Sequence, residues 1–177
     1  GEVGAGRRSG PNVGRILHEG GLGQELSRAA AFPEMLRVRS AETGAELGRL
    51  PLGESCRKRY GAPYATIHRA DFHKMLLMAV QQHTGAQLHM GQWVESFHES
   101  DDGVQLHTLD GWELEGSALV GADGLWSTVR HLLLNDDAPR VTGHLAYRSL
   151  IAQRDLPGYL RSRQVTVWMG PHLHVVQ

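Results

Sequence analysis

Two glycines and an aspartate that could contact a phosphate or a ribose follow a short apolar run in ALVGADGLWSTVRHLLL, residues 118–134. Gly121 and Gly124 carry no Cβ, so a bulky anion can come close to the backbone there, and a helix expected from near Ser127 directs its free N–H groups to the same place. Asp123 either accepts hydrogen bonds from ligand hydroxyl groups or orders the loop itself. The spacing therefore indicates a phosphate- or ribose-contacting turn, with a purely structural turn as the alternative.

A second cation with no evident structural role lies in IHRADFHKMLLMAVQQ, residues 67–82. The segment predicts a helix with Asp71 in its first turn and an apolar stripe formed by Phe72, Leu76, Ala79 and Val80. Arg69 would lie near the N-terminus of this helix, where the macrodipole disfavours a positive charge. A bound anion would explain its position.

Composition limits the class of protein. The chain has 177 residues, 41% of them hydrophobic, and a net charge of −1, which predicts one sizeable core and no basic face for nucleic acid. The apolar run around residues 75–80 is too short to span a membrane. The single cysteine, Cys56, excludes an intrachain disulfide and favours a reducing cytoplasm. His172 and His174 suggest no third ligand by their spacing, so no metal site is expected.

Periodicity and turn residues predict the elements that position these side chains. We expect helices from Pro11 and from Leu22, a hairpin over residues 35–50 and a loop over residues 51–66. The expected strands beyond the 67–82 helix are 87–90, 93–99, 104–107, 112–115, 118–120, 141–151, 164–169 and 173–177. Helices that alternate with strands in this order indicate an α/β protein in which the 118–120 strand returns to a parallel sheet.

The string GADGLWSTVR resembles the Asp-Gly motif of the FAD-dependent aromatic hydroxylases, the single-component flavoprotein monooxygenases. The family pattern falls on Asp123, Gly124, Ser127 and Arg130. The resemblance implies that Asp123, Gly124 and Arg130 contribute to FAD binding. In the same family a segment similar to His-Arg-Ala-Asp supplies an arginine to FAD, which implies that role for Arg69.

A third similar segment begins the chain. Gly4-Ala5-Gly6 with Pro11-Asn12 is similar to the family segment that comes near the flavin, so the resemblance implies a cofactor contact at Gly6. The departure is Arg7-Arg8-Ser9, where the family carries mostly apolar residues with a Gln. Two cations at the edge of a flavin pocket would cost desolvation free energy unless they are paired.

The Gly-His, two residues, Tyr-Arg-Ser segment at residues 143–149 most resembles the 3-hydroxybenzoate 6-hydroxylases, with salicylate hydroxylases nearly as similar. His144 could deprotonate a phenol, because the imidazole pKa lies near neutrality. Tyr147 could contact the substrate. Both have plainer interpretations, His144 as a surface or packing histidine and Tyr147 as a core tyrosine with a bonded hydroxyl.

The resemblance implies a fold and its division. Residues 1–140 would be a partial Rossmann-like FAD-binding domain with an inserted β-meander, lacking its first βαβ unit, and residues 141–177 the beginning of an α+β substrate domain. The chain starts at glycine and ends in two strands with no closing turn, which favours an internal fragment. The full-length protein could be a homodimer.

The implied activity is the hydroxylation of a phenolic aromatic acid with FAD, NADH or NADPH, and O₂. The product from 3-hydroxybenzoate would be gentisate, and a salicylate hydroxylase is the alternative within the family. A competing interpretation is a non-catalytic module, or a fragment that cannot hold FAD alone. No nucleic-acid or membrane partner is expected.

Overall fold

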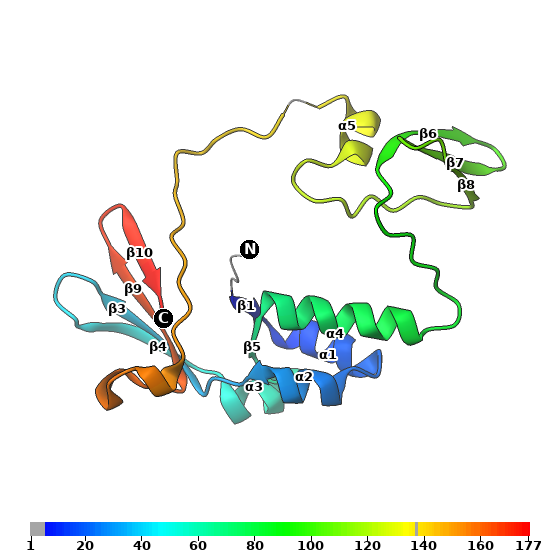
Figure 1. The fold of residues 1–177 in the computed structure, drawn as a ribbon. Helices are drawn as coiled ribbons and strands as arrows, with labels where there is room; N and C mark the ends of the chain where they lie inside the picture. Colours follow the sequence, from blue (N-terminus) through cyan, green and yellow to red (C-terminus); the bar gives the residue numbers. More distant parts are fainter. Residues whose placement is uncertain (1–5, 137) are drawn as a thin grey trace. The chain divides into compact units, whose positions relative to one another are not determined.

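The computed structural model describes residues 6–136 and 138–177, so Gly4 and Ala5 of the Gly-Ala-Gly segment lie outside the described residues. The chain forms two compact units (Figure 1). The first comprises Gly1–Ala86 together with Tyr147–Gln177, and the second comprises Gln87–Ala146. No helix in the described ranges is long and apolar enough to cross a membrane.

The first unit contains a small antiparallel sheet covered by helices. Its strands are β1 (Gly6–Ser9), β5 (Ala65–His68) and β2 (Ala30–Ala31), in the order β1-β5-β2. The helices are α1 (Pro11–Glu19), α2 (Gly23–Ala29), α3 (Gly53–Tyr60) and α4 (Arg69–Gln82). The core between β5 and helices α1, α2 and α4 consists of Leu17, Leu26, Ile67 and Met75.

The helices expected from Pro11, from Leu22 and after Ile67 are confirmed. Proline occupies the first turn of α1, where its missing N–H costs nothing, and the helix ends at Gly20. The predicted stripe of α4 is only partly right. Met75 is its buried residue, whereas Val80 is 37% exposed.

Helix α3 lies where a loop was predicted, and this prediction is wrong. Its sequence, GESCRKRY, is polar and offers only one buried side chain, that of Cys56. Gly61 ends the helix in the left-handed conformation, with φ of 76°. Helical stability here comes from packing against neighbours, which an apolar period cannot reveal in so short a segment.

The second sheet of this unit combines strands from both ends of the chain. It contains β3 (Met35–Ser40), β4 (Glu46–Pro51), β9 (Gln164–Gly170) and β10 (Leu173–Val176), in the order β10-β9-β3-β4. The β3–β4 and β9–β10 hairpins confirm the predicted turns. Strands β3 and β9 pair in parallel, so strands on both sides of the expected boundary at residue 140 share one sheet. The short 3₁₀ helices η1 (Gln153–Asp155) and η2 (Gly158–Leu160) precede β9.

The second unit is a β-meander with one helix. Strands β6 (Val94–Ser100), β7 (Gly103–Thr108) and β8 (Glu113–Gly116) pair antiparallel in sequence order. The Asp110-Gly111 turn is confirmed, and the Thr108 hydroxyl donates to Asp110 and accepts from the Trp112 N–H. Helix α5 (Thr128–Leu134) contacts β6 and buries Val129.

Three expected strands do not form, at residues 87–90, 118–120 and 141–151. Each is extended or irregular, and among the described residues no strand pairs with it. Side chains there are exposed, as in Val120 at 84% and Val141 at 97%. The mixed α/β content is confirmed, but the expected return of residues 118–120 to a parallel sheet is wrong for the described chain. Periodicity in the sequence indicates a strand, but a strand forms only where a neighbouring strand pairs with its backbone N–H and C=O groups.

Candidate cofactor-binding site

The Asp-Gly turn is a closed network of hydrogen bonds. Asp123 Oδ1 accepts from the Ser127 hydroxyl at 2.5 Å, and Oδ2 accepts from the Val129 N–H at 3.2 Å. Ser127 Oγ accepts in turn from the Arg130 N–H at 3.0 Å. Asp123 and Ser127 thus cap two N–H groups in the first turn of α5.

Asp123 therefore orders the loop, one of the two roles that its position indicated. The hydrogen bond from the Ser127 hydroxyl holds the pKa of the Asp123 carboxyl below its usual value. Burial acts in the opposite direction, and the Val129 N–H adds a smaller lowering of this pKa. The side chain is exposed, and two carboxylate oxygens have about four lone-pair sites in all. The exposed carboxylate is therefore accessible to a ligand hydroxyl group, which would share it with the N–H groups of the turn.

The turn requires glycine at its two glycine positions for different physical reasons. A Cβ on Gly121 would lie 2.8 Å from Cβ and from Cγ1 of Val129, so this glycine allows the loop to pack on α5. Gly124 has φ of 83°, a conformation that side chains disfavour, and a Cβ there would meet nothing within 4 Å. Only Gly124 leaves open space beside the backbone, as an approaching ligand requires.

The Arg130 side chain connects the segment after the C-terminus of α5 with the Asp-Gly turn. Its Nε donates to Asp136 Oδ2 at 2.7 Å, and its Nη2 donates to the Leu125 carbonyl oxygen at 3.2 Å. Asp136 and Ser127 were not singled out as partners from the sequence. Serine at an N-cap position is the one signal that could have found this network. Arg130 positions the turn, and its role as a direct cofactor contact stays a prediction.

Gly6 and Arg69 lie close together in the first unit. Gly6 pairs with His68 across β1 and β5, and Arg69 is the next residue, the first of α4. Arg69 is exposed and forms none of the ion pairs found among the described residues. His68 Nε2 is buried without a hydrogen-bond partner, while its Nδ1 lies 3.8 Å from Asp71. A Cβ on Gly6 would meet nothing within 4 Å.

His144 and Tyr147 lie on the extended segment after α5. The His144 N–H donates to Thr142 Oγ1 at 3.4 Å, and Tyr147 is 91% exposed. The expectation of a core tyrosine is therefore wrong for this chain. Their catalytic roles remain predictions, because neither residue belongs to the Asp123 network or to the Gly6–Arg69 group.

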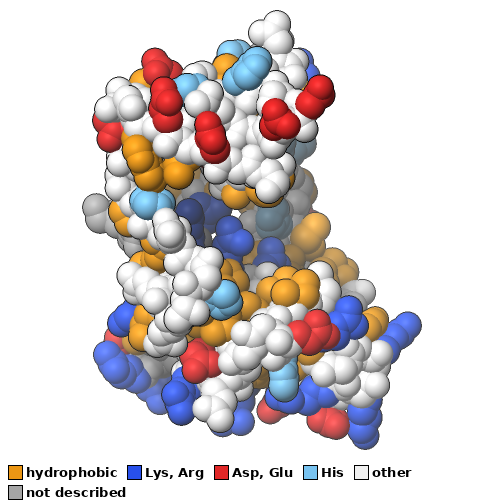
Figure 2. All heavy atoms as spheres, turned by 90° about the vertical axis from the view of Figure 1, so that its right-hand side faces the viewer, with side chains coloured by type: hydrophobic (Ala, Val, Ile, Leu, Met, Phe, Trp, Pro, Cys, Tyr) orange, Lys and Arg blue, Asp and Glu red, His pale blue; other side chains and the backbone are white. Residues whose placement is uncertain are grey.

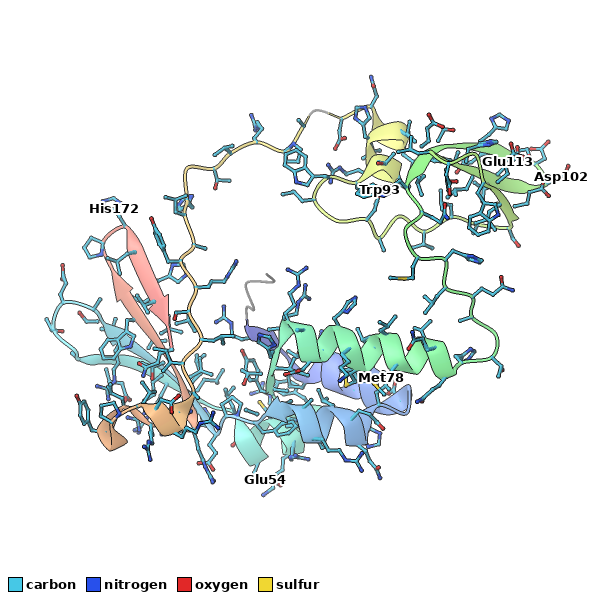
Figure 3. The ribbon with its side chains drawn as sticks, in the orientation of Figure 1. Glu54, Met78, Trp93, Asp102, Glu113 and His172 are labelled. Carbon is cyan, nitrogen blue, oxygen red and sulfur yellow. The ribbon has the colours of Figure 1, made fainter. Side chains whose placement is uncertain are left out.

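Charge is divided unevenly between the two units. Residues 87–146 carry two Lys or Arg against ten Asp or Glu, whereas the rest of the chain carries sixteen against nine. Figure 2 shows acidic side chains gathered over the meander, and Figure 3 places Asp102 and Glu113 there. The net charge near zero is thus a cancellation. The first unit, which holds Arg69, is basic and favours anionic ligands.

The matching sequence family decides the kind of cofactor. Residues 12–170 match the family described as FAD binding domain. The chain belongs to this family. The chain is 37% identical, over 99% of its length, to 3-hydroxybenzoate 6-hydroxylase 1 of Aquipseudomonas alcaligenes. It is 40% identical, over 98% of its length, to a 3-amino-4-hydroxybenzoate 2-monooxygenase of Streptomyces platensis.

The chain spans less than half of these relatives, 45% of the first and 43% of the second. Among solved structures it is similar to Klebsiella pneumoniae HpxO complexed with FAD and uric acid, with a TM-score of 0.68 and 22% identity. That match covers 97% of this chain and 43% of HpxO. The structural similarity supports the fold.

Each unit, taken by itself, offers groups that suit FAD. Gly6 and Gly124 leave unfilled space at the backbone, and Arg69 is an exposed cation outside the ion pairs of the described ranges. Asp123 presents an exposed carboxylate beside Gly124. A dinucleotide offers what these groups bind, namely phosphate and hydroxyl groups.

Proposed function

We propose that this chain is the FAD-holding portion of an NADH- or NADPH-dependent monooxygenase that hydroxylates a small phenolic aromatic acid. The observation that carries the proposal is the preformed Asp123–Ser127 turn, with Gly124 open beside it. The similarity to hydroxybenzoate and aminohydroxybenzoate hydroxylases supports the substrate class. Within this class we favour the conversion of 3-hydroxybenzoate to gentisate.

Each residue has a task suited to its chemistry. The Arg69 guanidinium would bind a phosphate oxygen, and Asp123 would accept hydrogen bonds from hydroxyl groups of the cofactor. Gly6 and Gly124 leave room for its approach, while Arg130 holds the turn in place through Asp136. FAD supplies the transfer of one oxygen atom from O₂, with electrons from the nicotinamide co-substrate.

His144 would accept the phenol proton of the substrate. Histidine is the side chain that most often acts as a general base, and a phenolate ring is richer in electrons than a phenol ring. Tyr147 would contact the ring of the substrate. Both assignments depend on residues 141–151 taking part in a substrate site of the whole protein.

The proposal has alternatives in the substrate and in the class of protein. Salicylate is one alternative substrate, and a heteroaromatic acid is another, because a 6-hydroxynicotinate 3-monooxygenase of Bordetella bronchiseptica is 34% identical to this chain. A non-catalytic module is favoured by one observation, the exposed Arg7 and Arg8 in the segment expected beside the flavin. Product analysis with 3-hydroxybenzoate, salicylate and 6-hydroxynicotinate distinguishes the alternative substrates.

The test is a titration of the purified chain with FAD, followed by flavin absorbance and fluorescence. We expect binding to perturb the flavin band. Arg69→Ala should weaken the affinity for FAD at least tenfold, because a charge-assisted hydrogen bond is worth about 1.5–3 kcal/mol. Arg49→Ala removes an exposed arginine that pairs with Glu46 and is the matched control.

Asp123→Asn keeps the size of the side chain and removes its charge. We expect it to weaken FAD binding while circular dichroism stays unchanged. Binding of FAD that is equal in Arg69→Ala, Asp123→Asn and Arg49→Ala would refute the assigned site. Absence of binding to the unaltered chain would favour the non-catalytic alternative.

A further inference from the structure

The helical core of the first unit packs on one face of the β1-β5-β2 sheet, through Ile67. Directly opposed residues of an antiparallel pair project to the same face. Ile67, which packs in the helical core, opposes Arg7, whereas Thr66 opposes Arg8. Arg8 and Thr66 therefore lie on the face away from that core. We call this the open face of the β1-β5-β2 sheet.

Two residues with little or no side chain lie on the open face. Gly6 opposes His68 on it, and Ala31 opposes Thr66 from the other side of β5. Gly6 has no side chain and Ala31 has only a methyl group, and both residues are exposed. A ligand can therefore approach the backbone beside Thr66 and His68.

Polar groups lie on the same face. Arg8 is exposed, and no carboxylate pairs with it within residues 6–136 and 138–177. Burial raises the pKa of the Tyr64 hydroxyl, while the nearby positive charge of Arg8 acts in the opposite direction. Tyr64 directly precedes β5 and lies two residues before Thr66, so the alternation of side chains, continued by one residue, places it on the same face as Thr66 and Arg8. Its hydroxyl, with the raised pKa, stays a neutral hydrogen-bond donor on that face. His68 Nε2, on the same face, is a buried polar atom without a partner.

We propose that Arg8 and Tyr64 form an oxyanion-binding subsite on the open face, which takes the carboxylate of a small aromatic acid or a phosphate of a dinucleotide. A guanidinium with an adjacent phenol presents the charge-assisted donors that such groups bind. In its carboxylate form the inference rests on the proposed function. It also gives Arg8 a partner, which removes the desolvation cost of an unpaired cation beside a ligand.

The neighbouring arginine supplies a matched control. Arg7 and Arg8 have the same charge and are both exposed on β1, but they project to opposite faces. Arg7→Gln and Arg8→Gln therefore change the net charge equally. Tyr64→Phe removes the phenolic donor and keeps the ring.

The experiment is calorimetric titration of the full chain and these three variants at low ionic strength. The probes are 3-hydroxybenzoate, its neutral analogue 3-hydroxybenzyl alcohol, and ADP. We expect Arg8→Gln to weaken one anionic probe by about tenfold or more, because it removes a charge-assisted hydrogen bond. Arg7→Gln should change affinity by less than about fivefold, the usual scale of an exposed charge. Tyr64→Phe should weaken the same probe as Arg8→Gln.

The outcomes separate the sources of the oxyanion. A loss confined to 3-hydroxybenzoate assigns the subsite to a carboxylate, and a loss confined to ADP assigns it to a phosphate. Equal losses in Arg7→Gln and Arg8→Gln, equal losses for the neutral analogue, or no binding of either anion would overturn the proposal. Failure of the proposed function is seen separately, as an unperturbed flavin band when FAD is titrated into the unaltered chain.

Discussion

Packing of the Asp-Gly turn on α5 can be tested at Gly121. In Gly121→Ala the new Cβ would meet Val129 at 2.8 Å, closer than real Cβ contacts. Val129 is buried at 7% exposure, so it cannot move freely into solvent. Such overpacking costs about 1–3 kcal/mol. We expect that loss in the free energy of unfolding, together with weaker FAD binding, because Asp123 Oδ2 accepts from the Val129 N–H.

A double-mutant cycle isolates the contact. Val129→Ala alone creates a cavity and destabilises, but in the Gly121→Ala background it also removes Cγ1, one of the two atoms that clash. The two losses should therefore add to more than the loss in the double mutant, with a coupling of about 0.5–3 kcal/mol. The assay is urea unfolding followed by tryptophan fluorescence, since Trp93, Trp112 and Trp126 all lie in residues 87–146.

Gly124→Ala is the control for this cycle. It also destabilises, by about 1–2 kcal/mol, but through its positive φ rather than through a contact. Val129→Ala should give no rescue in this background. Strict additivity for Gly121→Ala with Val129→Ala, or equal coupling at Gly124, would refute the packing argument.

Three further predictions concern hydrogen bonds and protons. Ser127→Ala should lower the free energy of unfolding by about 1 kcal/mol in urea titrations and raise the pKa of Asp123, whereas exposed Ser117→Ala should do neither. Because the pKa of Asp123 is lowered in the folded state, the ionised carboxylate contributes to the free energy of unfolding above the unfolded pKa of 3.8, and this contribution is lost as the pH falls from 3.8 through the folded pKa. Asp123→Asn should flatten this part of the dependence of stability on pH. Tyr64 is the opposite case, because its pKa is raised in the folded state: its contribution to the free energy of unfolding is fully present below pH 10.0 and is lost as the pH rises through the folded pKa. Arg8→Gln removes a positive charge that lowers this pKa, so it should move the tyrosinate midpoint in ultraviolet difference spectra to a still higher pH.

Elements made by local chemistry were predictable from the sequence. The Asp110-Gly111 hairpin forms because its turn residues suit a positive φ, and Gly111 has φ of 82°. Pro11 and Gly20 delimit α1 for equally local reasons. Helix α3 was missed because its polar sequence carries no apolar period, and residues 118–120 were overpredicted because a strand needs a partner.

The site was predictable only in part. Spacing along the chain found the Asp123 turn, because its partners lie within six residues. The proximity of Gly6 to Arg69 depends on the register between β1 and β5, which no local pattern fixes. Whether the lone pairs of Asp123 serve the loop or a ligand was likewise undecidable from residue types, since both uses require the same carboxylate.

The parallel pairing of β3 with β9 has a consequence for synthesis on the ribosome. Met35 pairs with Gln164, so the second sheet of the first unit closes a loop of about 130 residues. The β6-β7-β8 meander needs only contacts between neighbours in sequence and can form as soon as it emerges. The β3–β4 hairpin must instead wait, with the β3 edge unpaired, for β9 to be translated, at about 5–20 residues per second for some 6–25 seconds. Unpaired strand edges attract other chains, so this interval is when a nascent polypeptide of this kind most needs a chaperone.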